Sequence, residues 1–198
     1  MPAAELPLPQ RTQPPAPAAL AWLGTIGVAL GTGFAAVYVQ STFAPVGVFP
    51  LLVGALTGLA VAGVWEARGG ATRRTLITAG VVAGVIAVGA LHYGSYIVVR
   101  NDDERRRSLV PPQVLLADPS RGQENPALRT FGAFVEREWR RGRSLGSHHI
   151  EGAWLGVWWA LDAAAIVGMA AFIVPRVAKR IESAAERRIS DDERGATE

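Results

Sequence analysis

Four long apolar segments dominate the pattern of hydrophobic and polar positions along the chain. Three of them lie within residues 18–99, at 18–42, 46–66 and 76–99, and the fourth covers 152–175. Each is apolar around its whole circumference, without the alternation of a barrel strand. At about 1.5 Å per residue they would reach roughly 31–38 Å, and a bilayer's hydrocarbon core is roughly 30 Å thick. The pattern predicts an all-α membrane protein with a four-helix transmembrane bundle.

The polar stretches between these segments divide the rest of the chain. Residues 1–17 hold six prolines and predict a disordered or polyproline-like tail. Residues 100–151 form an extramembrane loop, whose prolines predict irregular structure over 100–127. Apolar residues at helical spacing predict a short amphipathic helix near 127–143, suited either to the membrane surface or to packing on the loop or a partner. Residues 176–198 predict a polar C-terminal helix and tail.

Composition agrees with a membrane protein once it is resolved along the chain. Charged residues make up 19% of the chain, below the roughly 25% of a soluble domain, and nearly all lie between the apolar segments. This excludes an ordinary soluble domain and a disordered chain. The net charge is +3, but acids and bases are interleaved, so we expect no nucleic-acid partner. The absence of cysteine excludes disulfides and thiolate chemistry.

The basic residues give a near tie for orientation. Ten lie in residues 100–151, and ten lie in the stretches 1–17, 66–75 and 176–198, which an even number of spans places on one side. The positive-inside rule weights short loops and the ends of spans. It therefore favours a multi-pass protein of the cell membrane with both termini in the cytoplasm. Nineteen of the twenty basic residues are Arg, a bias of GC-rich genomes that suggests a bacterial inner membrane.

Two ionisable residues lie inside the predicted spans. Asp162 is ten residues into the fourth span, and His92 is seven residues before the end of the third, near the same membrane face. Ionisable residues within a membrane are rare and are functional candidates by default. This intramembrane polar pair suggests a proton relay or a polar binding point. The alternative is an interhelical hydrogen bond that fixes the register of the bundle, worth about 1 kcal/mol, and the residues alone favour it.

A second polar group falls where the loop meets the fourth span. His148, His149 and Glu151 are residue types that bind zinc. However, adjacent side chains of an extended segment point in opposite directions, and no further ligand pair follows at helical spacing. The pattern favours interfacial polar residues over a metal site, and we expect no cofactor and no catalytic residues.

Each predicted span also carries glycines one helical turn apart. Small residues at this spacing let membrane helices approach closely. Fifteen glycines in the spans make some such pairs expected by chance, so they predict helix packing but no particular dimer. The pairs are Gly27/Gly31, Gly54/Gly58, Gly80/Gly84 and Gly152/Gly156.

No motif in the chain identifies a family, so function rests on these few features. The favoured hypothesis is a non-enzymatic scaffold or accessory subunit of a membrane assembly, with the lipid bilayer, a membrane protein or a second copy of the chain as partners. The alternative is a transport or proton-handling component that uses His92 and Asp162. An enzyme is least favoured because too few reactive groups converge. A pore should show polar stripes, whereas the threonines of the spans look scattered: Thr25, Thr32, Thr57 and Thr78.

Overall fold

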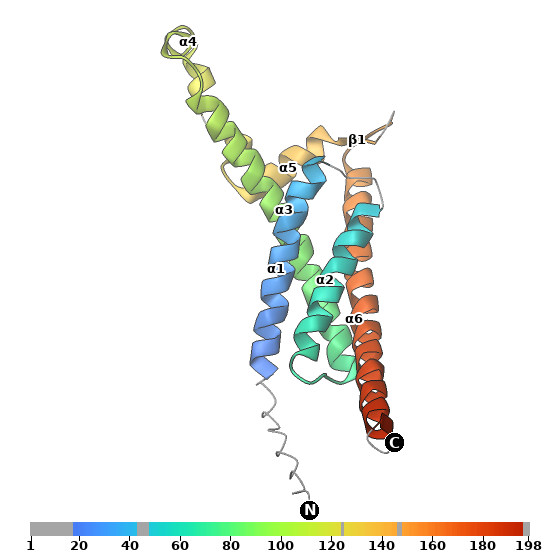
Figure 1. Ribbon diagram of the computed structural model, residues 1–198. Helices are drawn as coiled ribbons and strands as arrows, with labels where there is room; N and C mark the ends of the chain where they lie inside the picture. Colours follow the sequence, from blue (N-terminus) through green and yellow to red (C-terminus); the bar gives the residue numbers. More distant parts are fainter. Residues whose placement is uncertain (1–17, 43–47, 124, 146–147, 196–198) are drawn as a thin grey trace, which may run out of the picture.

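Four long helices form the body of the molecule in a computed structural model (Figure 1). The structure describes residues 18–42, 48–123, 125–145 and 148–195. The long helices are α1 (Ala18–Thr42), α2 (Val48–Glu66), α3 (Arg73–Ser108) and α6 (Ala153–Gly195). Each is long and apolar enough to cross a membrane, which confirms the all-α class and is compatible with a multi-pass membrane protein. The predicted tail 1–17 and the connection between the first two spans lie outside the described residues.

The helices alternate in direction. α1 and α3 start at the end of the bundle that holds Trp22 and Trp65, which we call the basal end; α2 and α6 run toward it from the opposite, loop end (Figure 1). The rings of Trp22 and Trp65 meet edge-on, with centroids 5.5 Å apart, so the start of α1 and the end of α2 lie at the same level. α6 packs against α2 and α3, and α1 also packs against these two helices.

Glycines at the helix crossings explain how closely α6 approaches its neighbours. A methyl group at Gly84 would lie 2.6 Å from the Cα of Val167, and one at Gly54 would lie 2.5 Å from the carbonyl oxygen of Ile166. Gly80 lies one turn from Gly84 on α3, and Gly58 lies one turn from Gly54 on α2. At both positions, an atom of α6 would lie within 2.9 Å of an added methyl group. Only a residue without a Cβ permits this spacing, so these pairs place backbone against backbone.

The other two glycine pairs do something different from the expected helix packing. A methyl at Gly27 or Gly31 would meet no atom within 4 Å among the described residues, because this face of α1 points away from the bundle. Gly152 has φ +58° and precedes the first residue of α6, so its role is a backbone turn. Gly156 lies under the ring of Trp139, which an added methyl would approach to 2.7 Å.

Three of the four threonines that looked scattered, Thr25, Thr32 and Thr57, tie α1 to α2 inside the bundle. The hydroxyls of Thr32 and Thr57 are 2.9 Å apart, and the indole N–H of Trp65 donates to the Oγ1 of Thr25 at 3.1 Å. Thr25 and Thr57 are fully buried and also donate to carbonyls of their own helices. Paired in this way, the hydroxyls satisfy one another instead of lining a pore.

The segment after the third span is more regular than its prolines indicated. α3 continues to Ser108, nine residues past the predicted end, so the expectation of irregular structure over 100–127 is wrong for its first part. Ion pairs one turn apart, Arg100–Glu104 and Asp103–Arg107, stabilise this extension, and the arginines of its last turn face the negative end of the helix dipole. Prolines then start each short element, which is a position where their missing N–H costs nothing. These elements are the α-helix α4 (Pro112–Ala117) and the two 3₁₀ helices η1 (Pro119–Gly122) and η2 (Pro126–Leu128).

The remainder of this segment folds back over the loop end of the bundle (Figure 1). It consists of α5 (Phe131–Arg141), β1 (Arg143–Leu145) and β2 (His148–Ile150). α5 starts four residues later than the helix expected near 127–143 and ends at Arg141, which is followed by Gly142 with a φ of +67°. The two strands pair antiparallel as a short hairpin that leads into α6.

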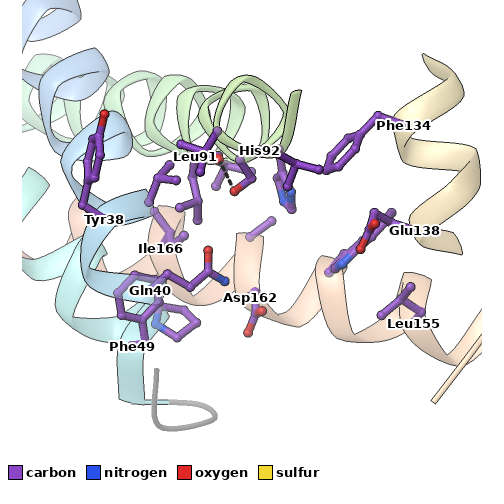
Figure 2. A pocket seen from close by; sticks show the side chains of 18 of the residues that line it. Tyr38, Gln40, Phe49, Leu91, His92, Phe134, Glu138, Leu155, Asp162 and Ile166 are labelled. Carbon is purple, nitrogen blue, oxygen red and sulfur yellow. Dashed lines mark hydrogen bonds between the residues drawn. The ribbon is translucent and has the colours of Figure 1, made fainter. Parts of the chain in front are cut away.

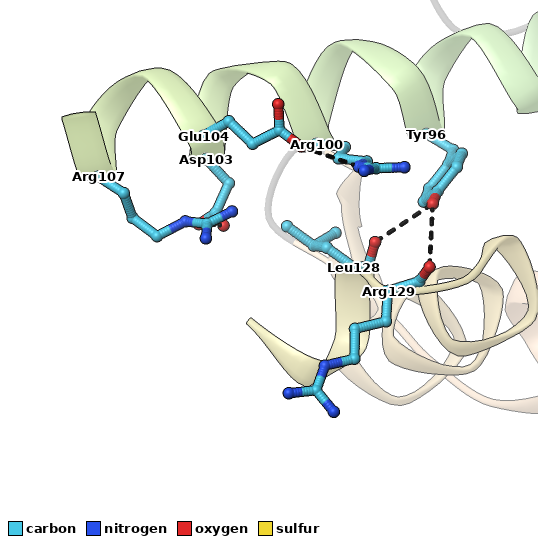
Figure 3. Close-up of polar contacts among 7 residues, drawn as sticks. All are labelled: Tyr96, Arg100, Asp103, Glu104, Arg107, Leu128 and Arg129. Carbon is cyan, nitrogen blue, oxygen red and sulfur yellow. Dashed lines mark hydrogen bonds and ion pairs between the residues drawn. The ribbon is translucent and has the colours of Figure 1, made fainter. Parts of the chain in front are cut away.

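Tyr96 of α3 anchors this returning segment, as Figure 3 shows. Its buried hydroxyl donates to the carbonyl of Leu128 at 3.2 Å, with that of Arg129 at 3.5 Å, and its ring packs against Phe134. A side-chain hydrogen bond with Tyr96, followed by one with Glu104, raises the pKa of Arg100 above its ordinary value. One turn of α3 therefore secures both the helix extension and the chain that returns over it.

Candidate functional site

A cavity of about 370 Å³ lies at the loop end of the bundle (Figure 2). α1, α2, α3, α5 and α6 all contribute to its wall. Most of the wall is apolar and aromatic, with Phe49, Phe134 and Trp159 among its residues. Polar side chains enter from four elements: Gln40 from α1, His92 and Ser95 from α3, Glu138 from α5 and Asp162 from α6. An apolar pocket with a few convergent polar groups is the usual form of a small-molecule site.

The cavity follows from the way α3 and α6 cross. The two helices touch at Gly84 and Val167, where the glycine lets their backbones meet. Straight helices that cross at one point separate on either side of it. Toward the loop end, α3 leans away from the rest of the bundle (Figure 1), and α5 covers the space that opens. The cavity thus lies where two helices diverge and is partly covered by a third.

His92 and Asp162 lie in this gap. His92 is eight residues beyond Gly84 on α3, and Asp162 is five residues before Val167 on α6, so both are displaced from the crossing toward the loop end. Both are half-buried and line the cavity. The imidazole of His92 also meets the ring of Trp159 edge-on, with centroids 5.7 Å apart. The structure therefore brings the two ionisable residues of the predicted spans to one cavity from two different helices.

Other polar groups at the cavity were not identified from the sequence. Glu138 comes from α5 and accepts hydrogen bonds from the guanidinium of Arg137 at 2.8 and 3.3 Å. Ser95 donates to the carbonyl of Leu91 on its own helix. Gln40 is the one side-chain amide in the first span, which is a signal that could have drawn attention to it. Glu138 carries no such signal, because its position depends on α5 folding back over the bundle.

Trp139 holds α5 in place over the cavity. Its ring lies against Gly156 and meets Trp159 with centroids 6.1 Å apart. Its carbonyl accepts a hydrogen bond from the N–H of Gly152 at 3.2 Å. At the other end of α5, Phe131 and Phe134 pack against Tyr96. Contacts at both ends thus fix the helix that closes the cavity.

The second polar group of the sequence lies away from this cavity. Glu151 is exposed between β2 and α6, and the side chains of His148 and His149 lie outside the described residues. Among the described residues, no group of three histidine, aspartate or glutamate side chains could hold a metal ion. His92, Glu138 and Asp162 line one cavity, yet they too do not form such a group.

Comparison with known proteins leaves the interpretation to the structure. No family model, no curated protein and no solved structure matches this chain. The fold and cavity define a class, a small all-α protein with four helices able to span a membrane and, at one end of their bundle, a mostly apolar cavity that a few polar side chains enter.

Proposed function

We propose that this chain is a multi-pass membrane protein that handles protons or a small polar solute, using His92 and Asp162. The observation that carries the proposal is that both residues line one cavity, although they come from α3 and α6. An imidazole and a carboxylate facing the same space can exchange a proton near neutral pH. A mere register-fixing contact would not need a cavity beside it.

The rest of the bundle supports entry from the loop end. Below the cavity, fully buried alanines of α1, α2 and α3 fill the core, together with Trp65. A solute in the cavity therefore meets a packed core on the basal side, while on the loop side the described residues cover it with α5, which is held by contacts at its two ends. The arrangement suits a binding or relay component that exchanges with one side of the membrane.

Proton flux in proteoliposomes tests this proposal. The purified chain, reconstituted with an internal pH-sensitive dye, should acidify or alkalinise the lumen when a membrane potential is imposed. Asp162→Asn and His92→Gln should each reduce the rate about a hundredfold, the usual contribution of a positioned acid or base. Asp102→Asn, an exposed carboxylate on the α3 extension, is the matched control and should leave the rate unchanged.

Thermal stability measured on the same samples separates the two roles of the pair. If Asp162→Asn lowers the unfolding temperature in detergent while the flux of all variants equals that of empty vesicles, the pair is a structural hydrogen bond and the proposal is wrong.

A second candidate function is a non-enzymatic scaffold or accessory subunit. It is favoured by apolar residues at the tip formed by the end of α3 and by α4, which stands beyond the bundle (Figure 1). Leu109 is 73% exposed and Leu116 is 85% exposed there. Lipid tails cover exposed leucines on the spans but not on a tip in water, where a protein partner would. Loss of a co-purifying subunit on changing Leu109 and Leu116 to Ser, with flux absent throughout, would support this candidate over the first.

We further propose a bacterial inner membrane with both termini in the cytoplasm. The position of the basic residues supplies the reason for the orientation. Arg68, Arg73 and Arg74 lie in a short connection, and three further cations follow the most apolar part of α6 directly, at Arg176, Lys179 and Arg180. Short loops and span ends carry the most weight in the positive-inside rule, which favours the basal end as the cytoplasmic one.

A further inference from the structure

Six basic side chains gather at the basal end of the bundle. They come from the α2–α3 connection, the start of α3 and the part of α6 that follows its most apolar stretch. We call them the basal patch: Arg68, Arg73, Arg74, Arg176, Lys179 and Arg180. The same stretches, 66–75 and 174–184, hold only two acids, Glu66 and Glu182.

Packing places these residues at one level although they are far apart in the sequence. Leu76 of α3, Trp65 of α2 and Val174 and Ala178 of α6 belong to one buried cluster. Arg73 and Arg74 precede Leu76 directly, and Arg176 and Lys179 flank the α6 members of the cluster. The cations on α3 and α6 therefore surround the same layer of the core.

Four of the six cations of the basal patch have no compensating charge within the described part of the chain. Arg73, Arg74, Lys179 and Arg180 are exposed and make no ion pair with a described residue. Arg73 and Arg74 also occupy the first turn of α3, whose helix dipole is positive there, so nothing in their own helix favours a cation. An external anion is the compensating group that this arrangement lacks.

The residues beside the patch indicate what kind of anion it takes. Ile77 lies one turn along α3 from Arg73 and is 37% exposed, and Phe172 lies one turn before Arg176 and is 50% exposed. The guanidinium of Arg176 lies over the ring of Phe172, 3.3 Å from its centroid. On both helices a cation thus sits directly beside an apolar side chain that faces outward from the bundle. A ligand with an anionic head and apolar tails matches both halves of this surface.

We propose that the basal patch binds the headgroup of an anionic phospholipid, with the acyl chains lying along Ile77 and Phe172. Clusters of Lys and Arg next to the end of a span attract anionic lipids, and each cation near the surface strengthens the attraction about fivefold. A free phosphate would use the cations but gain nothing from the apolar residues beside them.

Lipid retention by the purified chain tests the proposal. The full chain in mild detergent is mixed with phosphatidylglycerol or phosphatidylcholine, and native mass spectrometry counts the lipids that stay bound. A basal variant changes Arg73, Arg74, Arg176 and Lys179 to Gln. A loop variant with the same change in net charge replaces Arg105, Arg106, Arg129 and Arg141, all exposed at the other end.

The original chain and the loop variant should retain phosphatidylglycerol in preference to phosphatidylcholine, and the basal variant should lose this preference, by about fivefold per charge removed. Replacing Arg73, Arg74 and Arg176 by Lys, which keeps the charge, should retain the preference and would show that the loss in the basal variant is not due to misfolding. Equal retention by the basal variant, or equal loss in the loop variant, would overturn the proposal. So would thermal stabilisation by inorganic phosphate as large as that by phosphatidylglycerol.

Discussion

Gly84 makes the closest contact between α3 and α6 that a single substitution can test. In Gly84→Ala, the new methyl carbon would lie 2.6 Å from the Cα of Val167 and 3.1 Å from its Cγ2. Carbon atoms pack at about 3.5–4.0 Å, so the two helices must separate by about 1 Å at their crossing. Overpacking of this kind costs about 1–3 kcal/mol, since a backbone atom cannot move aside as a side chain can.

The matched control lies on the same helix. Gly89→Ala makes the same substitution five residues further along α3, where an added methyl would meet nothing within 4 Å. Any gain from the better helix propensity of alanine is shared by both variants and cancels in the comparison. We therefore expect the free energy of unfolding of Gly84→Ala to be about 1–3 kcal/mol below that of Gly89→Ala.

Unfolding by sodium dodecyl sulfate in mixed micelles gives this difference directly. The chain contains six Trp residues, so their fluorescence reports the transition without a label. Equal midpoints for the two variants would show that α3 and α6 do not cross at Gly84, and the account of the cavity as the gap beyond that crossing would fail with it.

Two further predictions concern the loop end and the orientation. Tyr96→Phe removes the hydroxyl that donates to the carbonyl of Leu128, so we expect faster proteolysis between α4 and α5. The free energy of unfolding of the bundle should change by no more than about 1.5 kcal/mol. Unchanged proteolysis would mean that the aromatic contacts alone hold this segment. Because the chain has no cysteine, Ser120→Cys and Ala184→Cys provide single labels at the two ends of the bundle. In intact cells a membrane-impermeant maleimide should label Ser120→Cys alone, and labelling of Ala184→Cys alone would reverse the orientation.

The spans were predictable because each depends on local composition alone. All-round apolarity over about twenty residues has few outcomes besides a membrane helix, and the end of α2 at Glu66 agrees with the hydropathy pattern. The end of α3 was not predictable in the same way. Hydropathy stops at the first charges, whereas Arg100 and Glu104 pair one turn apart and carry the helix on to Ser108.

The residues of the candidate site also differ in whether local sequence alone could identify them. His92 and Asp162 stand out in sequence because ionisable groups are costly in an apolar span. Their meeting at one cavity depends on where α3 and α6 cross, which the glycine spacing suggests but does not specify. Glu138 was missed because its place at the cavity requires a distant helix to fold back. Thr32 and Thr57 looked scattered for the same reason, since only the packing of α1 on α2 makes them partners.

The position of α6 has a consequence for how the protein is made. Chain order means that α1, α2 and α3 leave the ribosome before α6, and they are already able to pack on one another. Gly54, Gly58, Gly80 and Gly84 then form a bare seam along two helices, which is filled only by the last span. Asp162 arrives with that span. We therefore expect α1, α2 and α3 to be complete before the second ionisable group of the cavity is added with α6.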